Sequence, residues 1–346
     1  MSKYIMSDFW CTQPVPDEDV KPGEIDSSRI IAKEPQKLPD DFTWSTCTDE
    51  EAYTFLSEHY YDEDDTFKLD YTFENMRWVS GEHIVIRSDC DEIVGYSTYV
   101  PIKLRVEDKV LTFAQANFLC VHWGCRKFGF TPFLVQETVR RANMKGIWQG
   151  IATYERDVRG SVAKSHFLHR FLDVKKLIKT GFFNTNRPRE KYYEIQGPCK
   201  RPWRKMESKD ISKVVRILKR YTRDFKIAPH IDDNYVRDWL LPIHSYVNDE
   251  TDDFISFYDI SYARTDETDA VKQAYRFFIV GDIYNDTFLI AKNLGFHVFN
   301  TLDVGEDVEN LKRHKFMEGT GSVYYNLFNW SLSSAIESKD IHLILP

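Results

Sequence analysis

The segment N-F-L-C-V-H-W-G-C-R-K-F-G-F-T-P, residues 117–132, joins an apolar strand to a turn that contains glycine and then to the start of a helix. Asn117–Val121 has the apolar pattern of the end of a buried strand. Thr131 is a residue type favoured at a helix N-cap, and Pro132 suits the first helical position because it has no N–H group to leave unsatisfied. We therefore predict a strand, a tight turn and a helix in succession.

This turn has the properties of an anion site. Backbone N–H groups from Arg126 to Thr131 and the positive end of the helix dipole would face one point, and Arg126 and Lys127 would add full charges. The pattern predicts that a phosphate-bearing cofactor binds here. An ordinary strand-to-helix connection with two surface cations would match the same short motif, R-x-x-G-x-[GA] with Thr131 in the last place, so the interpretation depends on the rest of the chain.

The composition is that of a globular protein with an acidic surface. The 346 residues are 42% hydrophobic and 15% aromatic, and 54 acidic against 46 basic residues give a net charge of −8. A nucleic-acid partner is disfavoured because such sites need a basic face, whereas an acidic protein fits a cationic peptide. The six scattered cysteines indicate free thiols in a reducing, cytoplasmic compartment. Apolar runs fall short of the roughly 18 residues of a spanning helix, so no stable membrane insertion is expected.

Three motifs in the same order resemble the N-myristoyltransferase family. They are F-W-C-T-Q-P-V-P at Phe9–Pro16, L-P-D-D-F-T-W-S-T at Leu38–Thr46, and N-F-L-C-V-H at Asn117–His122. F-N-T-L-D at Phe299–Asp303 and F-N-W at Phe328–Trp330 extend the resemblance through the second half of the chain. The resemblance implies myristoyl-CoA as co-substrate, no metal, and N-terminal glycine peptides or nascent proteins as acceptors. The chain is identified as a divergent, compact member, for which a viral source is one hypothesis.

The predicted fold class is α/β (α+β), with two GNAT-like acyltransferase halves in tandem around one continuous mixed sheet. In the first half, Thr48 to Glu50 are expected to cap a helix that follows a short strand at Trp44. A meander of hairpins follows and ends in the phosphate turn. The remaining expected elements are strands at His83–Arg87, Ile93–Val100, Lys103–Val106, Val110–Phe113 and Ile147–Tyr154, and helices at Pro132–Asn143 and Ser161–Arg170.

From Trp203 the sequence repeats the order of strand, acidic cap and helix that is expected at Trp44. This repetition predicts an internal duplication. The proline-rich Gly197–Pro202 divides an N-terminal half, residues 1–200, from a C-terminal half, residues 201–346. The first would hold the acyl-CoA, and the second the peptide groove and the catalytic C-terminus. Expected elements downstream are strands at Phe254–Tyr258, Tyr275–Val280, Phe296–Asn300 and Val323–Trp330, and helices at Asp286–Leu294 and Gly305–His314.

The resemblance also implies a set of site residues. The backbone N–H groups of Phe118 and Leu119 would form an oxyanion hole, with Asn117 and Thr153 nearby. The α-carboxylate of Pro346 would act as the base on the glycine amine. By the same resemblance, the residues expected to contact acyl-CoA are Asp8, Phe9, Trp10, Leu119, Cys120, Val121, Arg126, Lys127, Gly129, Phe130 and Thr131. The residues expected to contact the peptide are Asp64, Asp65, Phe67, Leu69, His169 and Tyr258.

Several of these residues also have a plainer interpretation. Cys120 would be a buried, inert thiol because nothing adjacent would make it a thiolate. Leu343–Leu345 could form the last edge of the sheet, and His169 could be a surface residue of a helix. His166 and His169, at i and i+3 on that helix, could ligate a metal, although no carboxylate or thiolate is in register with them.

The chain departs from the family pattern at several positions. Where the family has R-S-K-R-x-A-P, Arg126–Pro132 reads R-K-F-G-F-T-P and loses a serine and a second arginine that touch phosphates. Asp8 replaces a glutamine before F-W, Phe167 replaces a tyrosine expected near the peptide glycine, and Tyr262 replaces a pocket serine. The family's contacts at these positions therefore do not carry over to this chain, which indicates a divergent member.

Taken together, the residues and the family resemblance imply a protein N-acyltransferase, expected to act as a monomer. It would move a long acyl chain, with myristoyl as the first candidate, from CoA to the N-terminal glycine of a protein or peptide. Two alternatives stay open. One is a GNAT-type enzyme that transfers a short acyl group, and the other is a catalytically silent homologue that binds acyl-CoA or lipidated peptide.

Overall fold

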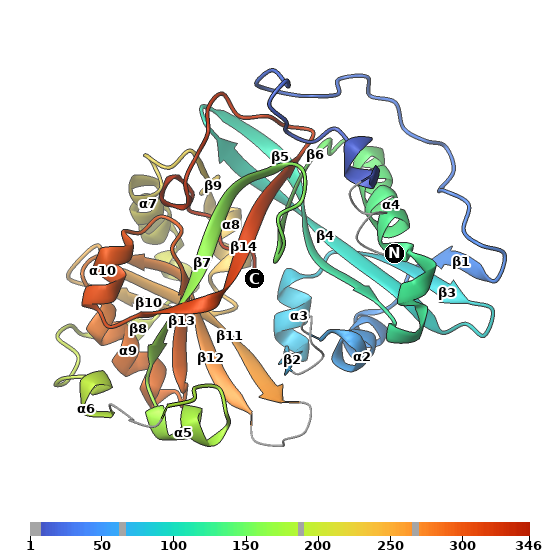
Figure 1. Cartoon of the computed structure of the whole chain (residues 1–346). Helices are drawn as coiled ribbons and strands as arrows, with labels where there is room; N and C mark the ends of the chain where they lie inside the picture. The colour runs from blue at the N-terminus through green and yellow to red at the C-terminus, as the bar shows by residue number, and fades with distance from the viewer. Residues whose placement is uncertain (1–7, 62–66, 186–189, 265–269) are drawn as a thin grey trace.

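A computed structural model describes residues 8–61, 67–185, 190–264 and 270–346. These residues form one mixed sheet of fourteen strands with helices packed on it (Figure 1). The strands are β1 Phe42–Ser45, β2 Phe67–Asp70, β3 Glu82–Ser88, β4 Ile93–Val106, β5 Lys109–Val121, β6 Gln149–Tyr154, β7 Ser161–Phe171, β8 Trp203–Lys205, β9 Ile227–Pro229, β10 His244–Asn248, β11 Phe254–Arg264, β12 Val271–Val280, β13 Val298–Leu302 and β14 Met317–Phe328. The helices are α2 Asp49–His59, α3 Phe73–Val79, α4 Phe130–Met144, α5 Val174–Lys179, α6 Glu190–Tyr193, α7 Ile211–Tyr221, α8 Asp233–Trp239, α9 Tyr284–Asn293 and α10 Val308–Arg313, with 3₁₀ turns η1 Trp123–Phe128, η2 Ser208–Asp210 and η3 Ser338–Asp340.

The sheet repeats one order of elements. Antiparallel strands β3, β4 and β5 are followed by α4 and by β6, which is parallel to β5. Strands β10, β11 and β12 are followed by α9 and by β13, which is parallel to β12. The last strands are exchanged, because β7 pairs with β13 and β14 pairs with β6. The predicted continuous mixed sheet is therefore confirmed, and the two halves share it.

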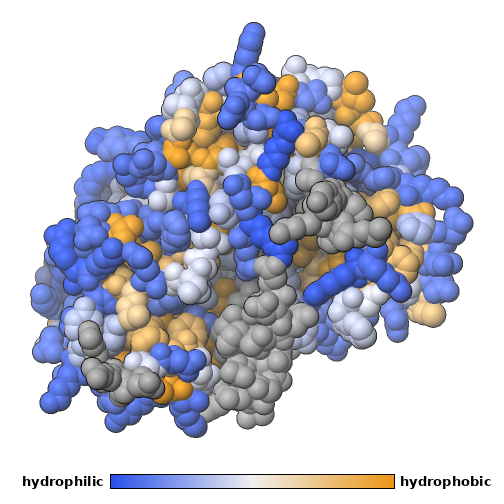
Figure 2. Space-filling model, viewed as in Figure 1, coloured by the Kyte–Doolittle hydropathy of each residue, from blue (hydrophilic) through white to orange (hydrophobic). Residues whose placement is uncertain are grey.

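The helices cover both faces of the sheet, as the alternation of β3 shows. Val85 lies in the core with α2, α3, α7 and α8, whereas Ile84 and Ile86 lie in the core under α4. This alternation follows from the two-residue period of a strand. On the outside, Figure 2 shows polar residues predominating on the viewed face, with apolar residues in separate small groups. Among the described residues, every helix is too short or too polar to cross a bilayer.

The local prediction at the first helix is confirmed. The Thr48 side chain accepts from the Glu51 N–H at 3.2 Å, and the Glu51 carboxylate accepts from the Thr48 N–H at 2.9 Å. This reciprocal capping box satisfies two N–H groups that a helix start leaves free. The two predicted hairpins are also present, although β4 is one continuous strand rather than two short ones.

The predicted helix at Ser161–Arg170 is wrong, because these residues form strand β7. Ala163, Ser165 and Leu168 are buried, while Lys164 and His166 between them are exposed. Arg170 is 3% exposed and donates hydrogen bonds to the carbonyls of Phe171 and Tyr193. A charged residue on the buried face obscures the two-residue alternation, so the sequence imitates a helix.

The predicted start of α4 is also wrong. The N-cap is Gly129 rather than Thr131, and the helix begins at Phe130. Gly129 adopts φ 69°, which is favourable for glycine and strained for other residues. This turn directs the Phe130 ring into the core, 4.8 Å from the ring of Phe42. Thr131 and Pro132 therefore occupy the second and third helical positions, where Pro132 is still tolerated because first-turn N–H groups have no helical partner.

Candidate active site

The sheet opens between β5 and β6. The two strands pair only where Phe113–Gln115 meets Gln149–Ile151. Beyond Gln115, the edge of β5 that faces away from β4 has no strand partner in the described part of the chain. Predicted residues Leu119, Cys120 and Val121 lie on this separated stretch. The backbone there is available to a ligand, because its N–H and C=O groups are not used by a neighbouring strand on that side.

A β-bulge interrupts β5 at the same place. Tyr99 of β4 is paired with Ala116, and Thr98 is paired with Phe118, so Asn117 is an extra residue. Bulges of this kind redirect the backbone and are frequent beside active sites. Phe118 and Leu119, whose N–H groups the family resemblance assigns to an oxyanion hole, directly follow the bulge on the stretch of β5 that lies beyond its pairing with β6.

Side chains around the bulge hold it in one arrangement. The Asn117 amide donates to the Val79 carbonyl at 2.5 Å, and its oxygen accepts from the Gln115 amide at 2.7 Å. The Phe118 ring is buried between Tyr60 and Tyr71, with centroid distances of 5.5 and 5.2 Å. The amide of Asn117 is thus occupied in fixing the strand.

The turn between β5 and α4 keeps the features expected of an anion site. Arg126 and Lys127 are exposed in η1, next to the N-cap Gly129. No described side chain caps the N-terminus of α4, so its first N–H groups stay free to bind an anion. A helix of this length carries a positive partial charge at that end. The residues present fit a phosphate group, because two exposed cations lie beside a helix N-terminus without a side-chain cap.

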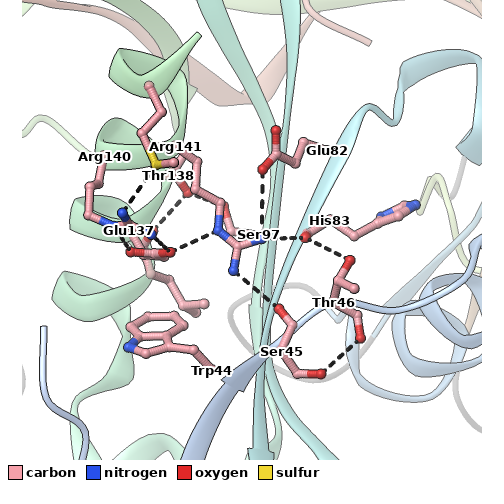
Figure 3. Close-up of polar contacts among 12 residues, drawn as sticks. Trp44, Ser45, Thr46, Glu82, His83, Ser97, Glu137, Thr138, Arg140 and Arg141 are labelled. Carbon is pink, nitrogen blue, oxygen red and sulfur yellow. Dashed lines mark hydrogen bonds and ion pairs between the residues drawn. The ribbon is translucent and has the colours of Figure 1, made fainter. Parts of the chain in front are cut away.

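Helix α4 is tied to the sheet through the buried carboxylate of Glu137 (Figure 3). Its two oxygens accept from Arg140 at 2.7 and 2.8 Å and from Arg141 at 2.8 Å. Arg141 reaches on to the carbonyls of His83 on β3 and Ser45 on β1, both at 3.3 Å. Burial disfavours the charged form of Glu137, but the two arginines outweigh it and lower the pKa of this carboxyl below its ordinary value.

The N-terminal arm covers the other side of the opening. Phe9 and Trp10 are buried, and Trp10 packs edge-on against Tyr154 at 6.0 Å. The Trp10 Nε1–H group is buried and has no hydrogen-bond partner in the described part of the chain. An unpaired buried donor beside the opening is a natural contact for a ligand acceptor. Asp8, in contrast, is exposed.

The C-terminal tail runs into the core. Leu343 and Ile344 are buried in the largest hydrophobic cluster, and Figure 1 shows the C-terminus at the centre of the view. The Tyr325 hydroxyl donates to the Leu343 carbonyl at 2.6 Å. Tyr325 is also the β14 partner of Thr153 on β6. This contact brings the tail that ends at Pro346 close to Thr153, and the alternative in which Leu343–Leu345 form a sheet edge is wrong because they are not a strand.

Tyr258, a predicted peptide contact, lies in an aromatic cluster that joins the two halves. Tyr258 is buried, stacks on Tyr275 at 5.4 Å and touches Trp78 at 5.6 Å. His169, which the sequence placed on a helix, lies on β7, and its Nδ1 hydrogen-bonds Asn300 at 2.8 Å. Burial lowers the pKa of His169, so the ring is neutral at pH 7.

The acidic residues Asp64 and Asp65 lie outside the described residues. Phe67 and Leu69 belong to β2, which pairs with β11 at Leu69 opposite Tyr262. This pairing places the segment after the acidic loop next to the strand that carries Tyr258. The peptide contacts of these residues stay predictions.

Two alternative chemistries find no support in the geometry. Burial raises the pKa of the Cys120 thiol to about 12, so this residue is a thiol at neutral pH rather than a nucleophilic thiolate. His166 and His169 do not share a helix face; His166 pairs with Asp303 at 3.3 Å and His169 bonds Asn300. In the described ranges, no cluster of three or more histidine, cysteine or carboxylate side chains could hold a metal.

Comparisons with known proteins identify the family. The model of the N-terminal domain of myristoyl-CoA:protein N-myristoyltransferase matches residues 24–164, and that of its C-terminal domain matches residues 183–343. Glycylpeptide N-tetradecanoyltransferase 1 of Arabidopsis thaliana is 31% identical over 100% of this chain and 90% of that protein. The chain belongs to the N-myristoyltransferase family.

Other relatives agree along most of the chain. Glycylpeptide N-tetradecanoyltransferase 2 of Bos taurus is 32% identical over 97% of this chain and 76% of that protein. A crystal structure of Saccharomyces cerevisiae N-myristoyltransferase with bound myristoyl-CoA superposes with a TM-score of 0.86 at 25% identity, over 96% of this chain and 90% of that chain. A second, with myristoyl-CoA and inhibitors, gives 0.87 at 26% identity over 95% and 91%. The predicted acyltransferase fold is confirmed.

Four residues at the site were not predicted from the sequence: Gln115, Tyr60, Tyr71 and Tyr325. Gln115 is buried and orients Asn117. Tyr60 and Tyr71 lie on either side of the acidic loop in sequence, and both rings contact the Phe118 ring. Their placement around that loop was the one sequence feature that could have pointed to this contact. Tyr325 touches a segment 18 residues away in sequence, and no local pattern indicates that contact.

Proposed function

We propose that this chain transfers a myristoyl group from myristoyl-CoA to the N-terminal glycine of a protein or peptide. The observation that carries the proposal is the match to glycylpeptide N-tetradecanoyltransferases along the whole chain. Local support comes from the opening between β5 and β6, which ends at an uncapped helix N-terminus beside Arg126 and Lys127.

Acyl-CoA supplies a thioester whose carbonyl carbon is open to attack by an amine. The backbone N–H groups of Phe118 and Leu119, held by the bulge at Asn117, would stabilise the negative charge that develops on the carbonyl oxygen. Thr153, on the facing strand end, would help to orient the reacting groups. The new C–N bond replaces the C–S bond, and the leaving thiolate takes up a proton. No covalent intermediate on the enzyme is needed.

The terminal carboxylate of Pro346 is the proposed base. A free α-carboxyl group has a pKa of about 3.5, so it is ionised at neutral pH. Its charge would attract the glycine ammonium and accept a proton as attack begins. The buried tail and its hydrogen bond from Tyr325 support this role, because they fix a chain end that would otherwise be mobile.

Each half of the chain would bind one of the two substrates. Residues 1–200 would hold acyl-CoA through Phe9, Trp10 and the turn at Arg126–Thr131. Residues 201–346 would form much of the peptide groove with Tyr258, joined by His169 from β7. Asp64 and Asp65 would attract basic residues of the peptide.

We also propose that the protein acts in the cytoplasm as a monomer, without stable membrane insertion and without a nucleic-acid partner. Its six cysteines are free, as a reducing compartment favours. A net charge of −8 fits a basic peptide rather than a polyanion. Glycine-initiated nascent proteins or peptides are the expected partners.

A transfer assay with a glycine-initiated octapeptide and acyl-CoAs of 2 to about 16 carbons tests the function. Burial of each CH₂ contributes about 0.8 kcal/mol, so myristoyl-CoA should exceed acetyl-CoA in kcat/KM by several orders of magnitude. The matched control is the same peptide with alanine in place of its first glycine, which should not be acylated. Equal turnover of acetyl-CoA and myristoyl-CoA would instead indicate a short-chain acetyltransferase, and binding without turnover a silent homologue.

A further inference from the structure

The C-terminal tail carries a histidine with unusual surroundings. His342 lies four residues before the chain end and is 1% exposed. Its ring lies among Phe278 at 4.6 Å, Tyr221 at 5.0 Å and Phe225 at 5.3 Å between centroids. Neither ring nitrogen makes a hydrogen bond of normal geometry to a described residue. Apart from a contact with the Phe277 backbone, this fully buried imidazole lacks a polar partner among the described residues, and this needs an explanation because native structures pair such groups with few exceptions.

Within the described part of the chain, the charged and titratable groups that face the ring provide no counter-ion for it. Arg276 on β12 is fully buried, and its charge acts against a second cation at His342. The carboxylate of Glu306 is already engaged, with Arg276 at 2.8 Å and the Tyr284 hydroxyl at 2.9 Å. On α7 the titratable group is the phenol of Tyr221, whose pKa is raised by burial, so it stays uncharged.

Space around the ring is equally restricted. Gly305 adopts φ 65°, and a Cβ atom built there would lie 2.9 Å from the Nδ1 atom of His342. The loop at Gly305 therefore packs closely against the docked imidazole. Burial, together with the Arg276 charge, lowers the pKa of His342 to about 3, although the Phe277 backbone acts in the opposite direction. The aromatic site accepts the neutral ring and disfavours the protonated one.

We infer that His342 is a positioning residue that makes docking of the C-terminal tail depend on protons. The neutral ring anchors the tail between α7, β12 and the loop at Gly305. Protonation releases the tail and withdraws the Pro346 carboxylate from the opening between β5 and β6. The inference rests on the proposed function, since the terminal carboxylate is the group that docking delivers to the substrates.

The size of the effect follows from proton linkage. In the undocked tail, His342 should titrate near the ordinary value of about 6.5, whereas the docked ring stays neutral far below that pH. The docked tail is therefore most stable above about pH 6.5 and loses stability as the pH falls. The equilibrium constant for tail opening should rise about tenfold for each pH unit between about 6.5 and 5.

Hydrogen exchange measures this opening directly. The amide of His342 donates to the Ile227 carbonyl at 2.8 Å, so it exchanges only when the tail opens. We would follow peptides covering residues 338–346 between pH 5 and pH 7.5, after correction for intrinsic exchange rates. The variants are His342→Leu, which fills the site with a group that cannot be protonated, and His230→Leu as a matched histidine control. His342→Phe serves as a second variant if the leucine form folds poorly.

The wild type and the His230→Leu control should lose about tenfold protection per pH unit below about 6.5, and His342→Leu should show no such slope. Single-turnover transfer should fall at low pH more steeply in the wild type and in the His230→Leu control than in His342→Leu, because the rate drops as the undocked fraction becomes populated, with the Kd for myristoyl-CoA unchanged in all three proteins. A slope retained in both His342 variants, or absent from the wild type, would overturn the inference. Failure of the proposed function is distinct, since it would appear as no transfer by the wild type at pH 7.5 whatever the exchange data.

Discussion

Replacing Glu137 by glutamine tests whether the buried carboxylate fastens α4 to the sheet. Glu137 accepts three hydrogen bonds from Arg140 and Arg141 at 2.7–2.8 Å, and its side chain is 1% exposed. Glutamine has the same size and keeps one acceptor oxygen, but it removes the charge that compensates two guanidinium groups. Losing one partner of a buried ion pair costs about 3–5 kcal/mol. The arginine side chains are 15% and 19% exposed, so water offsets part of this loss, and we expect a loss of about 3 kcal/mol.

Urea unfolding, followed by tryptophan fluorescence and far-ultraviolet circular dichroism, measures this change. The matched control is Glu50→Gln, which removes an exposed carboxylate from α2 and should change the free energy of unfolding by less than about 0.5 kcal/mol. An unfolding free energy of Glu137→Gln within about 0.5 kcal/mol of the wild type would refute the anchoring role. The Kd for acyl-CoA should rise as well, because the N-terminus of the same helix belongs to the proposed phosphate site.

The pH dependence of stability gives the same test a second readout. Because the pKa of Glu137 is lowered in the folded protein, its contribution is present above its unfolded value of about 4.5 and is lost as the pH falls below that value. Glu137→Gln should therefore show a smaller loss of stability between pH 5 and pH 3 than the wild type. An identical acid dependence in the two proteins would mean that the carboxylate is not held in its charged form by Arg140 and Arg141.

Two further predictions concern the substrates. The double change Arg126→Ala with Lys127→Ala should raise the Kd for acyl-CoA at least tenfold, since a charge-assisted hydrogen bond contributes about 1.5–3 kcal/mol; unchanged affinity in calorimetry would place the phosphates elsewhere. Appending three residues after Pro346 should lower the single-turnover rate by roughly 10²-fold and leave the Kd for acyl-CoA unchanged, because the terminal charge is moved away from the amine. Full transfer by the extended protein would mean that another group is the base.

The elements that could be predicted from the sequence are those fixed by neighbouring residues. Thr48 and Glu51 form a capping box from three-residue spacing alone, and the hairpins β3–β4 and β4–β5 follow from short polar turns between apolar strands. The succession of strand, turn and helix around Arg126 was predicted in the same way, while the anion site at that turn stays a prediction. In each case the determining contacts lie within a few residues of each other.

The errors arise where distant contacts override the local pattern. Arg170 is buried on β7 because the carbonyls of Phe171 and Tyr193 accept from it, and without knowledge of those acceptors a buried arginine contradicts a strand. The helix begins at Phe130 rather than at the predicted Pro132 because the Phe130 ring packs on Phe42, which lies 88 residues earlier. The bulge at Asn117 depends on its register with β4, which the sequence does not encode locally.

The exchange of the last strands links the topology to the chemistry. Because β14 lies between β6 and β7, Tyr325 faces Thr153 on one side and Ala163 on the other. The hydroxyl of Tyr325 then holds the tail at Leu343, next to the strand that borders the acyl-CoA opening. If β14 paired with β13 of its own half, the chain end would follow it to the far side of the sheet, away from Thr153. The proposed base at the terminus would therefore depend on the shared sheet, because this strand order is what brings the buried tail next to β6.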